Sequence, residues 1–212
     1  MDLVHPLAEN YAAKFTSPLD AMRHKVEQET LAHHEHSIML SGHVQGIVLE
    51  MISRMIKPVN ILEIGTFTGF SALCLVKGLQ PGGILHTIEI RDKDAGICEQ
   101  YFKEAKMQQQ IKLHRGNALH IIPALHEEWD LVFIDADKVN YINYYELTLA
   151  SVKKGGWLLA DNVLFHGEVL EEKLTGKNAK AIAAFNKYVA NDSRVQQVIL
   201  TLRDGLMLIR KK

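Results

Sequence analysis

The chain has 212 residues, of which 47% are hydrophobic and 23% charged, and its formal net charge is −1. These values are typical of one globular domain with a sizeable core, and they give no general electrostatic attraction to nucleic acids or anionic membranes. Two cysteines, no signal-peptide pattern and no apolar run near the roughly 18 residues of a membrane span predict a cytoplasmic protein with buried thiols at Cys74 and Cys98.

Residues 1–40 are expected to form amphipathic helices ahead of the main sheet. Ser17-Pro18 resembles a helix N-cap followed by proline at the first helical position. The polar stretch 33–36, three histidines and a glutamate, has no second cluster at metal-ligand spacing, so an exposed helix or loop is expected there. A further helix opens after Ser41-Gly42, has apolar residues at helical spacing and ends at Lys57-Pro58.

The stretch from Val59 to Ser71 predicts a buried strand, a glycine turn and the start of a helix. Gly65 and Gly69 allow the backbone to approach a ligand, and the helix N-terminus offers free N–H groups. Their Gly-x-x-x-Gly spacing lacks the dinucleotide fingerprint. The next strand ends in Glu89, and an acid about 20 residues past a glycine turn commonly binds ribose hydroxyls.

The remaining chain continues to alternate between strand and helix. Tyr141, Tyr144 and Tyr145, in one predicted helix, are expected to pack in the core rather than to contact a ligand. Five strand–helix units followed by a hairpin describe an α/β fold, a doubly wound and mostly parallel sheet with one reversed strand. The further segments expected are helix 93–106, strand 111–115, a helix after 116–118, strand 131–134, helix 141–152, strand 157–160, loop 162–176, helix 177–191 and strands 195–202 and 206–210.

Two of these strands end in oxygen-bearing side chains. One apolar run ends at Asp135 and the other at Asp161-Asn162. Because ligands of open α/β sheets bind beyond the carboxyl ends of the strands, these three side chains are expected to meet at one point. Two carboxylates and an amide oxygen suit Mg²⁺, Mn²⁺ or Ca²⁺ better than zinc. The alternative is that Asp135 and Asp161 only cap the helices that follow.

Four segments, residues 63–71, 133–138, 155–162 and 204–206, together resemble the cation-dependent O-methyltransferases, which include plant caffeoyl-CoA and animal catechol O-methyltransferases. The resemblance runs from about Ser41 to the C-terminus. It implies the Rossmann-like class I fold, with seven strands and the last one antiparallel, in a single S-adenosylmethionine-dependent domain over residues 1–212 with variable helices in 1–40. It also implies a homodimer.

The resemblance assigns a role to each matching residue. Asp135, Asp161 and Asn162 match the metal ligands, for Mg²⁺ or else Mn²⁺ or Ca²⁺. Lys138 matches the proposed base, beside Asp135 in the catalytic site. Arg203 lies among substrate-side residues, and Asn117 stands where many relatives have aspartate. The matching cofactor contacts are Ser41, Glu63, Gly65, Ser71, Glu89, Asn117, Ala118 and Asp135.

The implied reaction moves a methyl group from a sulfonium to a hydroxyl of a small catechol-like acceptor. A phenol is mostly neutral at pH 7, and a bound divalent cation lowers its pKa and orients it. Lys138 can accept the proton if the same cation lowers the lysine pKa. The alternative is that Lys138 only neutralises Asp135 or Asp137.

The sequence leaves other functions open. Some bacterial relatives methylate a hydroxylated uridine in transfer RNA, and a basic surface near Arg23, Lys25 and residues 210–212 would favour that acceptor. A nicotinamide-dependent oxidoreductase would share the sheet but needs the missing third glycine. A non-catalytic cofactor-binding protein fits poorly with intact metal and base positions.

Overall fold

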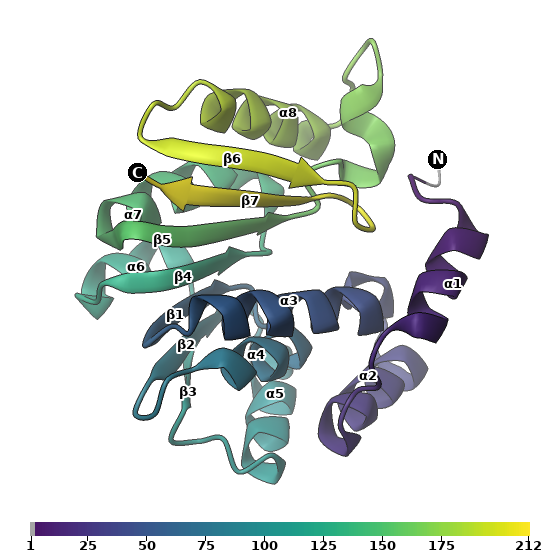
Figure 1. Ribbon diagram of the computed structural model, residues 1–212, viewed down its shortest axis with the longest axis vertical. Coiled ribbons are helices and arrows are strands. Elements are labelled where there is room, and N and C mark those ends of the chain that lie inside the picture. Colours follow the sequence, from purple (N-terminus) through teal and green to yellow (C-terminus); the bar gives the residue numbers. More distant parts are fainter. Residues whose placement is uncertain (1–2) are drawn as a thin grey trace.

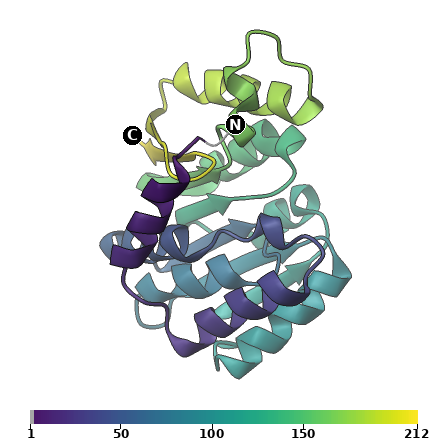
Figure 2. The same cartoon turned by 90° about the vertical axis from the view of Figure 1, so that its right-hand side faces the viewer.

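A computed structural model describes residues 3–212, and these form one seven-stranded sheet with helices on both faces (Figures 1 and 2). Residues 1–2, which belong to the helical stretch expected over 1–40, lie outside the described part. The strands are β1 (Asn60–Ile64), β2 (Ile84–Glu89), β3 (Ile111–Arg115), β4 (Trp129–Ile134), β5 (Val152–Asp161), β6 (Val195–Leu200) and β7 (Leu206–Lys211).

The strand order is β3-β2-β1-β4-β5-β7-β6. Strands β1 to β5 are parallel to one another, whereas β7 is antiparallel to both β5 and β6. The chain winds outward from β1 to β3, returns to β4 on the other side of β1, and then winds the opposite way. The predicted doubly wound sheet with an antiparallel last strand is confirmed.

Two layers of helices cover the sheet, as the core shows. Side chains of α2 to α5 belong to one buried apolar cluster and those of α6 to α8 to another. The α-helices are α1 (Pro6–Phe15), α2 (Ala21–His33), α3 (His43–Ile56), α4 (Phe70–Leu75), α5 (Asp92–Glu104), α6 (Ala118–Leu125), α7 (Tyr141–Ser151) and α8 (Lys177–Ala190). Short 3₁₀ turns are η1 (Ser37–Met39), η2 (Val76–Gly78), η3 (Lys138–Asn140) and η4 (Phe165–Leu170).

The N-terminal helices differ from the prediction in where the second one begins. Ser17-Pro18 lies between α1 and α2 and caps neither helix. The N-cap of α2 is Asp20, whose carboxylate accepts a hydrogen bond from the backbone N–H of Arg23 at 3.0 Å. The prediction that the helix begins at Ser17-Pro18 was therefore wrong. The carboxylate of Asp20 accepts a hydrogen bond from a free backbone N–H group at the helix end, which proline cannot do.

Strand β5 is longer than the predicted run 157–160. It begins at Val152 and continues through Gly155 and Gly156, where the pairing with β4 shifts register. Gly155 has φ +80°, a value that only glycine adopts freely. The predicted loop 162–176 contains η4 but is otherwise irregular. Glycine in the strand interior therefore marks an irregularity of the strand rather than its start.

The buried cysteines were predicted correctly, since Cys74 and Cys98 are both buried and unpaired. Of the helices within residues 3–212, none has both the length and the apolar character needed to cross a membrane.

Candidate active site

A cavity of about 610 Å³ lies at the carboxyl edge of the parallel strands. It is beside the ends of β1 and β4, where the winding of the sheet reverses and where open α/β sheets bind ligands. Its volume lies within the usual range for ligand pockets, on the order of 300–1,000 Å³. Its lining includes most of the predicted site residues: Ser41, Gly65, Ser71, Glu89, Asn117, Ala118, Asp135, Lys138, Asp161 and Asn162.

Gly65 brings the ends of β1 and β4 together. A Cβ atom at this position would lie 1.9 Å from the carbonyl oxygen of Asp135, and φ is +99°. The backbone N–H of Asp135 donates to the carbonyl of Ile64 at 2.9 Å. The glycine is therefore required by this close approach, which places Asp135 at the cavity.

Glu63 differs from the other predicted cofactor contacts because it is fully buried and is not part of the cavity lining. One carboxylate oxygen accepts a hydrogen bond from the Ser71 hydroxyl at 2.6 Å, and the other accepts from Thr87. Burial raises the pKa of Glu63 to about 8, although both hydrogen bonds oppose that shift. Glu63 is thus linked to the cavity indirectly, through the hydroxyl of the lining residue Ser71.

Glu89 is held at the cavity wall by backbone donors. The N–H of Phe67 donates to Oε2 at 2.7 Å and the N–H of Arg91 donates to Oε1 at 2.9 Å. An ionised carboxylate has about four lone-pair sites, so Glu89 can still accept hydrogen bonds from ligand hydroxyls. At the next strand end the amide oxygen of Asn117 accepts from the N–H of Leu119 at 2.9 Å and caps α6.

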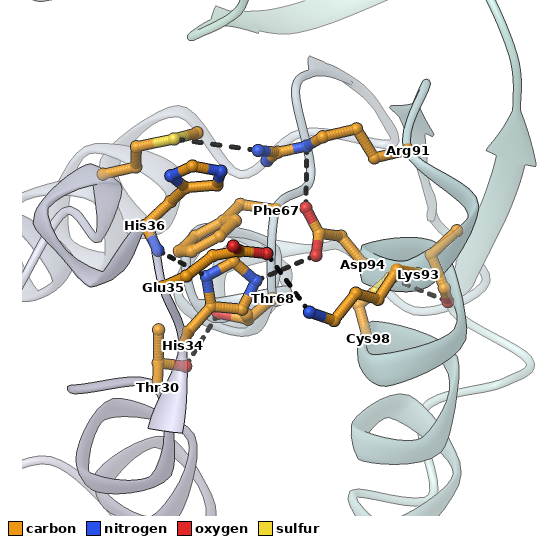
Figure 3. Close-up of polar contacts among 12 residues, drawn as sticks. Thr30, His34, Glu35, His36, Phe67, Thr68, Arg91, Lys93, Asp94 and Cys98 are labelled. Carbon is orange, nitrogen blue, oxygen red and sulfur yellow. Dashed lines mark hydrogen bonds and ion pairs between the residues drawn. The ribbon is translucent and has the colours of Figure 1, made fainter. Parts of the chain in front are cut away.

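The expectation of an exposed helix or loop is confirmed for His33, Glu35 and His36, whereas His34 is half-buried and makes the contacts drawn in Figure 3. The His34 side chain is 6% exposed. Its Nδ1 accepts from the N–H of His36 at 3.0 Å, so Nε2 carries the proton and donates to Asp94 at 2.9 Å. The ring also meets Phe67 edge to face, with 4.5 Å between centroids. His34 therefore connects the segment before Ser41 to Asp94 and Phe67, and Phe67 belongs to the part of the cavity wall that contacts Glu89.

The predicted metal ligands Asp135 and Asn162 meet at the ammonium group of Lys138. Its Nζ donates to Asp135 Oδ1 at 3.0 Å and to Asn162 Oδ1 at 2.7 Å. Asn162 has φ +56°, a left-handed conformation that asparagine tolerates better than most residues. Burial opposes the ammonium charge, but Tyr141 and Asp135 outweigh this effect and raise the pKa of Lys138. The two oxygens are thus arranged around a positive charge.

Asp161 is buried, and its carboxylate is held by two donors. Oδ1 accepts from the N–H of Asn162 at 2.8 Å, and Oδ2 accepts from the side-chain amide of Gln45 at 2.6 Å. Burial, together with the nearby charge of Asp135, raises the pKa of Asp161 to about 6. Gln45 was missed in the sequence, although it shares helical spacing with the buried Leu49 and Ile52 of α3, which marks it as an inward-facing polar residue.

The donor set fits a hard divalent cation in its chemistry. Within residues 3–212 no three His, Cys, Asp or Glu side chains gather as a metal site, so the set needs the amide oxygen of Asn162 as its third donor. Oxygen donors alone favour Mg²⁺, Mn²⁺ or Ca²⁺. In the structure the side-chain oxygens of Asp135 and Asn162 contact the ammonium of Lys138.

The tyrosines of α7 pack in the core, as predicted, and the hydroxyl groups of Tyr141 and Tyr144 also make polar contacts beside the candidate site. The hydroxyl of Tyr141 lies 2.7 Å from Lys138 Nζ and donates to the carbonyl of Asp161 at 3.0 Å. Tyr144 lines the cavity and donates to the carboxylate of Asp137. Tyr145 packs in the core as expected. The apolar spacing of the helix predicts that the tyrosine rings are buried, but it gives no information about the partners of their hydroxyl groups.

The comparisons with known proteins agree with this geometry. A family model described as O-methyltransferase matches residues 15–212. A catechol O-methyltransferase of Niastella koreensis is 32% identical over 74% of this chain and 73% of its own, and a caffeoyl-CoA O-methyltransferase of Populus trichocarpa is 29% identical over 87% and 79%. An O-methyltransferase of Bacillus cereus, solved in complex with SAH, superposes with a TM-score of 0.87 at 28% identity over 97% of both chains. TomG of Streptomyces achromogenes, solved with SAM, gives 0.89 at 26% identity over 97% of this chain and 96% of its own.

Proposed function

The chain belongs to the O-methyltransferase family, and we propose that this S-adenosylmethionine-dependent enzyme requires a divalent cation and methylates one hydroxyl of a small catechol-like acceptor. Family membership argues against the nicotinamide-dependent oxidoreductase and the non-catalytic binding protein. The observation that carries the metal proposal is the pair of side-chain oxygens, from Asp135 and Asn162, that contacts one cationic group beside the buried Asp161.

The proposed mechanism places Lys138 as the base. When bound by Asp135, Asp161 and Asn162, a divalent cation would lower the pKa of a coordinated hydroxyl and orient it. Lys138 is positively charged while it contacts Asp135, so it can accept a proton only after its pKa falls. A second positive charge nearby favours the neutral amine. Lys138, once it has released its own proton to solvent, would take the hydroxyl proton on Nζ. The phenolate oxygen would then form a bond to the methyl carbon while the bond between that carbon and the sulfonium sulfur breaks, which releases S-adenosylhomocysteine.

The wall of the cavity supports a free aromatic acceptor over a CoA thioester. Arg91 pairs with Glu89 and Asp94, and Arg203 donates to Gln45 and to a backbone carbonyl. Lys138 is held as described above, so each of the Arg and Lys side chains in the described lining already contacts a protein group. Phosphate recognition normally uses such cations, so we favour an acceptor without phosphates.

A transfer RNA acceptor is the second candidate, and the surface gives it little support. Arg23 is buried and paired with Asp20 and Glu50 rather than exposed. Lys25 lies 2.5 Å from Glu104. The ammonium of Lys211 donates to backbone carbonyls of the chain. Three of the basic residues that were expected to favour RNA binding therefore already contact carboxylates or backbone carbonyls of the chain.

A homodimer is proposed from an α3–β6 apolar surface, which we define as Met51, Met55, Val198 and Leu200. Met51, Met55 and Val198 are 57%, 73% and 52% exposed. Val198 pairs with Leu208, whose side chain packs toward the α3 layer, so the strand and helix residues share a face. In Figure 1 no helix of the described chain crosses in front of β6 and β7. A second copy would cover these side chains.

The cytoplasmic location and the single domain over 1–212 stay predictions. The two buried, unpaired cysteines suit a reducing compartment.

The decisive experiment measures methyl transfer from S-adenosylmethionine to a panel of free catechols, a CoA thioester of a catechol acid and hydroxylated transfer RNA, each with Mg²⁺ and with EDTA. We expect turnover of free catechols that EDTA abolishes and Mg²⁺ restores. Asp161→Ala should remove this metal-stimulated activity and leave SAH affinity unchanged. Equal turnover in EDTA, or turnover of the RNA alone, would contradict the proposal.

A further inference from the structure

One buried amide connects the β6–β7 turn to the candidate metal ligand Asp161. Gln45 lies in the first turn of α3, its side chain is fully buried, and it does not line the cavity. Its Nε2 donates to Asp161 Oδ2 at 2.6 Å, and its Oε1 accepts from Arg203 at 3.3 Å. Arg203 also donates to the carbonyl of Ser41. The guanidinium of Arg203 is therefore linked to Asp161 through one side chain, that of Gln45.

The chemistry of the three groups determines which way the amide points. A guanidinium only donates hydrogen bonds and an ionised carboxylate only accepts them, whereas a glutamine amide has a donor at one end and an acceptor at the other. Gln45 can satisfy both neighbours in the observed orientation and in no other. Methionine, of similar length, would remove both hydrogen bonds.

The hydrogen bonds on Asp161 restrict how its carboxylate can rotate. Oδ1 accepts from the N–H of Asn162, and Oδ2 accepts from Gln45. With about four lone-pair sites on the carboxylate, sites remain for a cation on the cavity side. Side chains that hydrogen-bond to a metal-ligating group typically contribute a factor of about 10–100 in metal affinity.

We infer that Gln45 and Arg203 are positioning residues that orient Asp161 toward a divalent cation, with Arg203 acting through Gln45. The inference rests on the proposed function, because it takes Asp161 as a metal ligand. It gives Arg203 a different main role from the substrate contact implied by resemblance, since the contacts of the guanidinium are with Gln45 and Ser41.

The test measures Mn²⁺ binding to the full chain by isothermal titration calorimetry in the absence of acceptor. Gln45→Met and Arg203→Met should each raise the Mn²⁺ Kd by about 10–100-fold, and Gln45→Met should leave the SAH Kd unchanged. The double variant should bind Mn²⁺ about as well as Gln45→Met alone, because residues on one path are not additive. Gln108→Met, at an exposed turn position, is the matched control and should bind like wild type.

The outcomes separate this inference from the proposed function. Wild-type Mn²⁺ affinity in Gln45→Met, with affinity lost in Asp161→Ala, would overturn the inference and leave the metal proposal standing. No Mn²⁺ binding to the wild type would overturn both. If the two substitutions weaken Mn²⁺ binding additively in the double variant, the inference that Arg203 acts through Gln45 is wrong. If Gln45→Met does not fold, Arg203→Met decides, because an unchanged Mn²⁺ Kd in that variant would overturn the inference.

Discussion

The ammonium of Lys138 and the side-chain oxygen of Asn162 lie 2.7 Å apart across a separation of 24 residues. The proposed base therefore contacts a proposed metal ligand directly. Lys138→Met should lower kcat by about 10²–10⁴-fold, the usual contribution of a general base. The SAH Kd should stay unchanged, and divalent-cation affinity should not weaken, because a competing positive charge has been removed.

Steady-state kinetics and cation titration check this prediction. Lys153→Met is the control, because it removes a lysine that pairs with Asp130 at 2.8 Å, and Lys153 is not in the cavity lining. A pH–rate profile for Lys138→Met that matches the wild type would show that the base is another group.

Glu63 should make the protein less stable as pH rises from about 6.5 to 8. Its folded pKa is about 8, against an ordinary value of 4.5, so in this range the folded state keeps a proton that the unfolded state has released. Raising the pH therefore favours unfolding. Relative to Glu63→Gln, the wild type should lose about 1.5 kcal/mol of its free energy of unfolding across that range.

Urea denaturation at both pH values measures the difference. Glu63→Gln keeps the shape of the side chain but cannot titrate, and other titrating groups such as His86 are common to both proteins. Free energies of unfolding that change in parallel would mean that Glu63 is ionised in the folded state.

Gly65 and Gly96 should respond oppositely to alanine. At Gly65 the new Cβ would lie 1.9 Å from the backbone of Asp135, so Gly65→Ala should cost several kcal/mol, on the order of the largest single-residue effects, or prevent folding. Gly96 is inside α5 with no atom within 4 Å of a new Cβ. Gly96→Ala should stabilise the protein by about 0.5–1 kcal/mol. Thermal unfolding compares the two, and a Gly65→Ala protein as stable as the wild type would refute the close approach.

The α3–β6 apolar surface should control assembly. Met51→Lys combined with Val198→Lys should convert a wild-type dimer to a monomer, because burying two ammonium groups at an interface is unfavourable. Light scattering after size-exclusion chromatography measures the molar mass of each variant in solution. Leu170→Lys, which changes another exposed apolar residue, should remain a dimer. A monomeric wild type at every concentration would contradict the proposed homodimer.

The side chains that the structure brings to one cavity, as the sequence predicted, are those carried by strand ends. Apolar runs located β4 and β5, and a parallel sheet brings their carboxyl ends together, so Asp135, Asp161 and Asn162 were expected at one point and all three line the cavity. Gln45 could not be found in this way, because it lies 116 residues from Asp161 and meets it only once α3 has docked. The contact of His34 could not be predicted from the sequence either, because its partner Asp94 is on another helix.

The position of β7 between β5 and β6 has a consequence for how the chain is made. Although β6 precedes β7 in the sequence, it is hydrogen-bonded to the sheet only through β7. During synthesis β6 leaves the ribosome before β7, the strand with which it pairs, so β6 cannot join the sheet until β7 has been made. Because Arg203 lies in the turn between these strands, its hydrogen bond to Gln45 depends on the docked hairpin. The contacts that link Arg203, Gln45 and Asp161 are therefore completed only after the C-terminal strand has been translated.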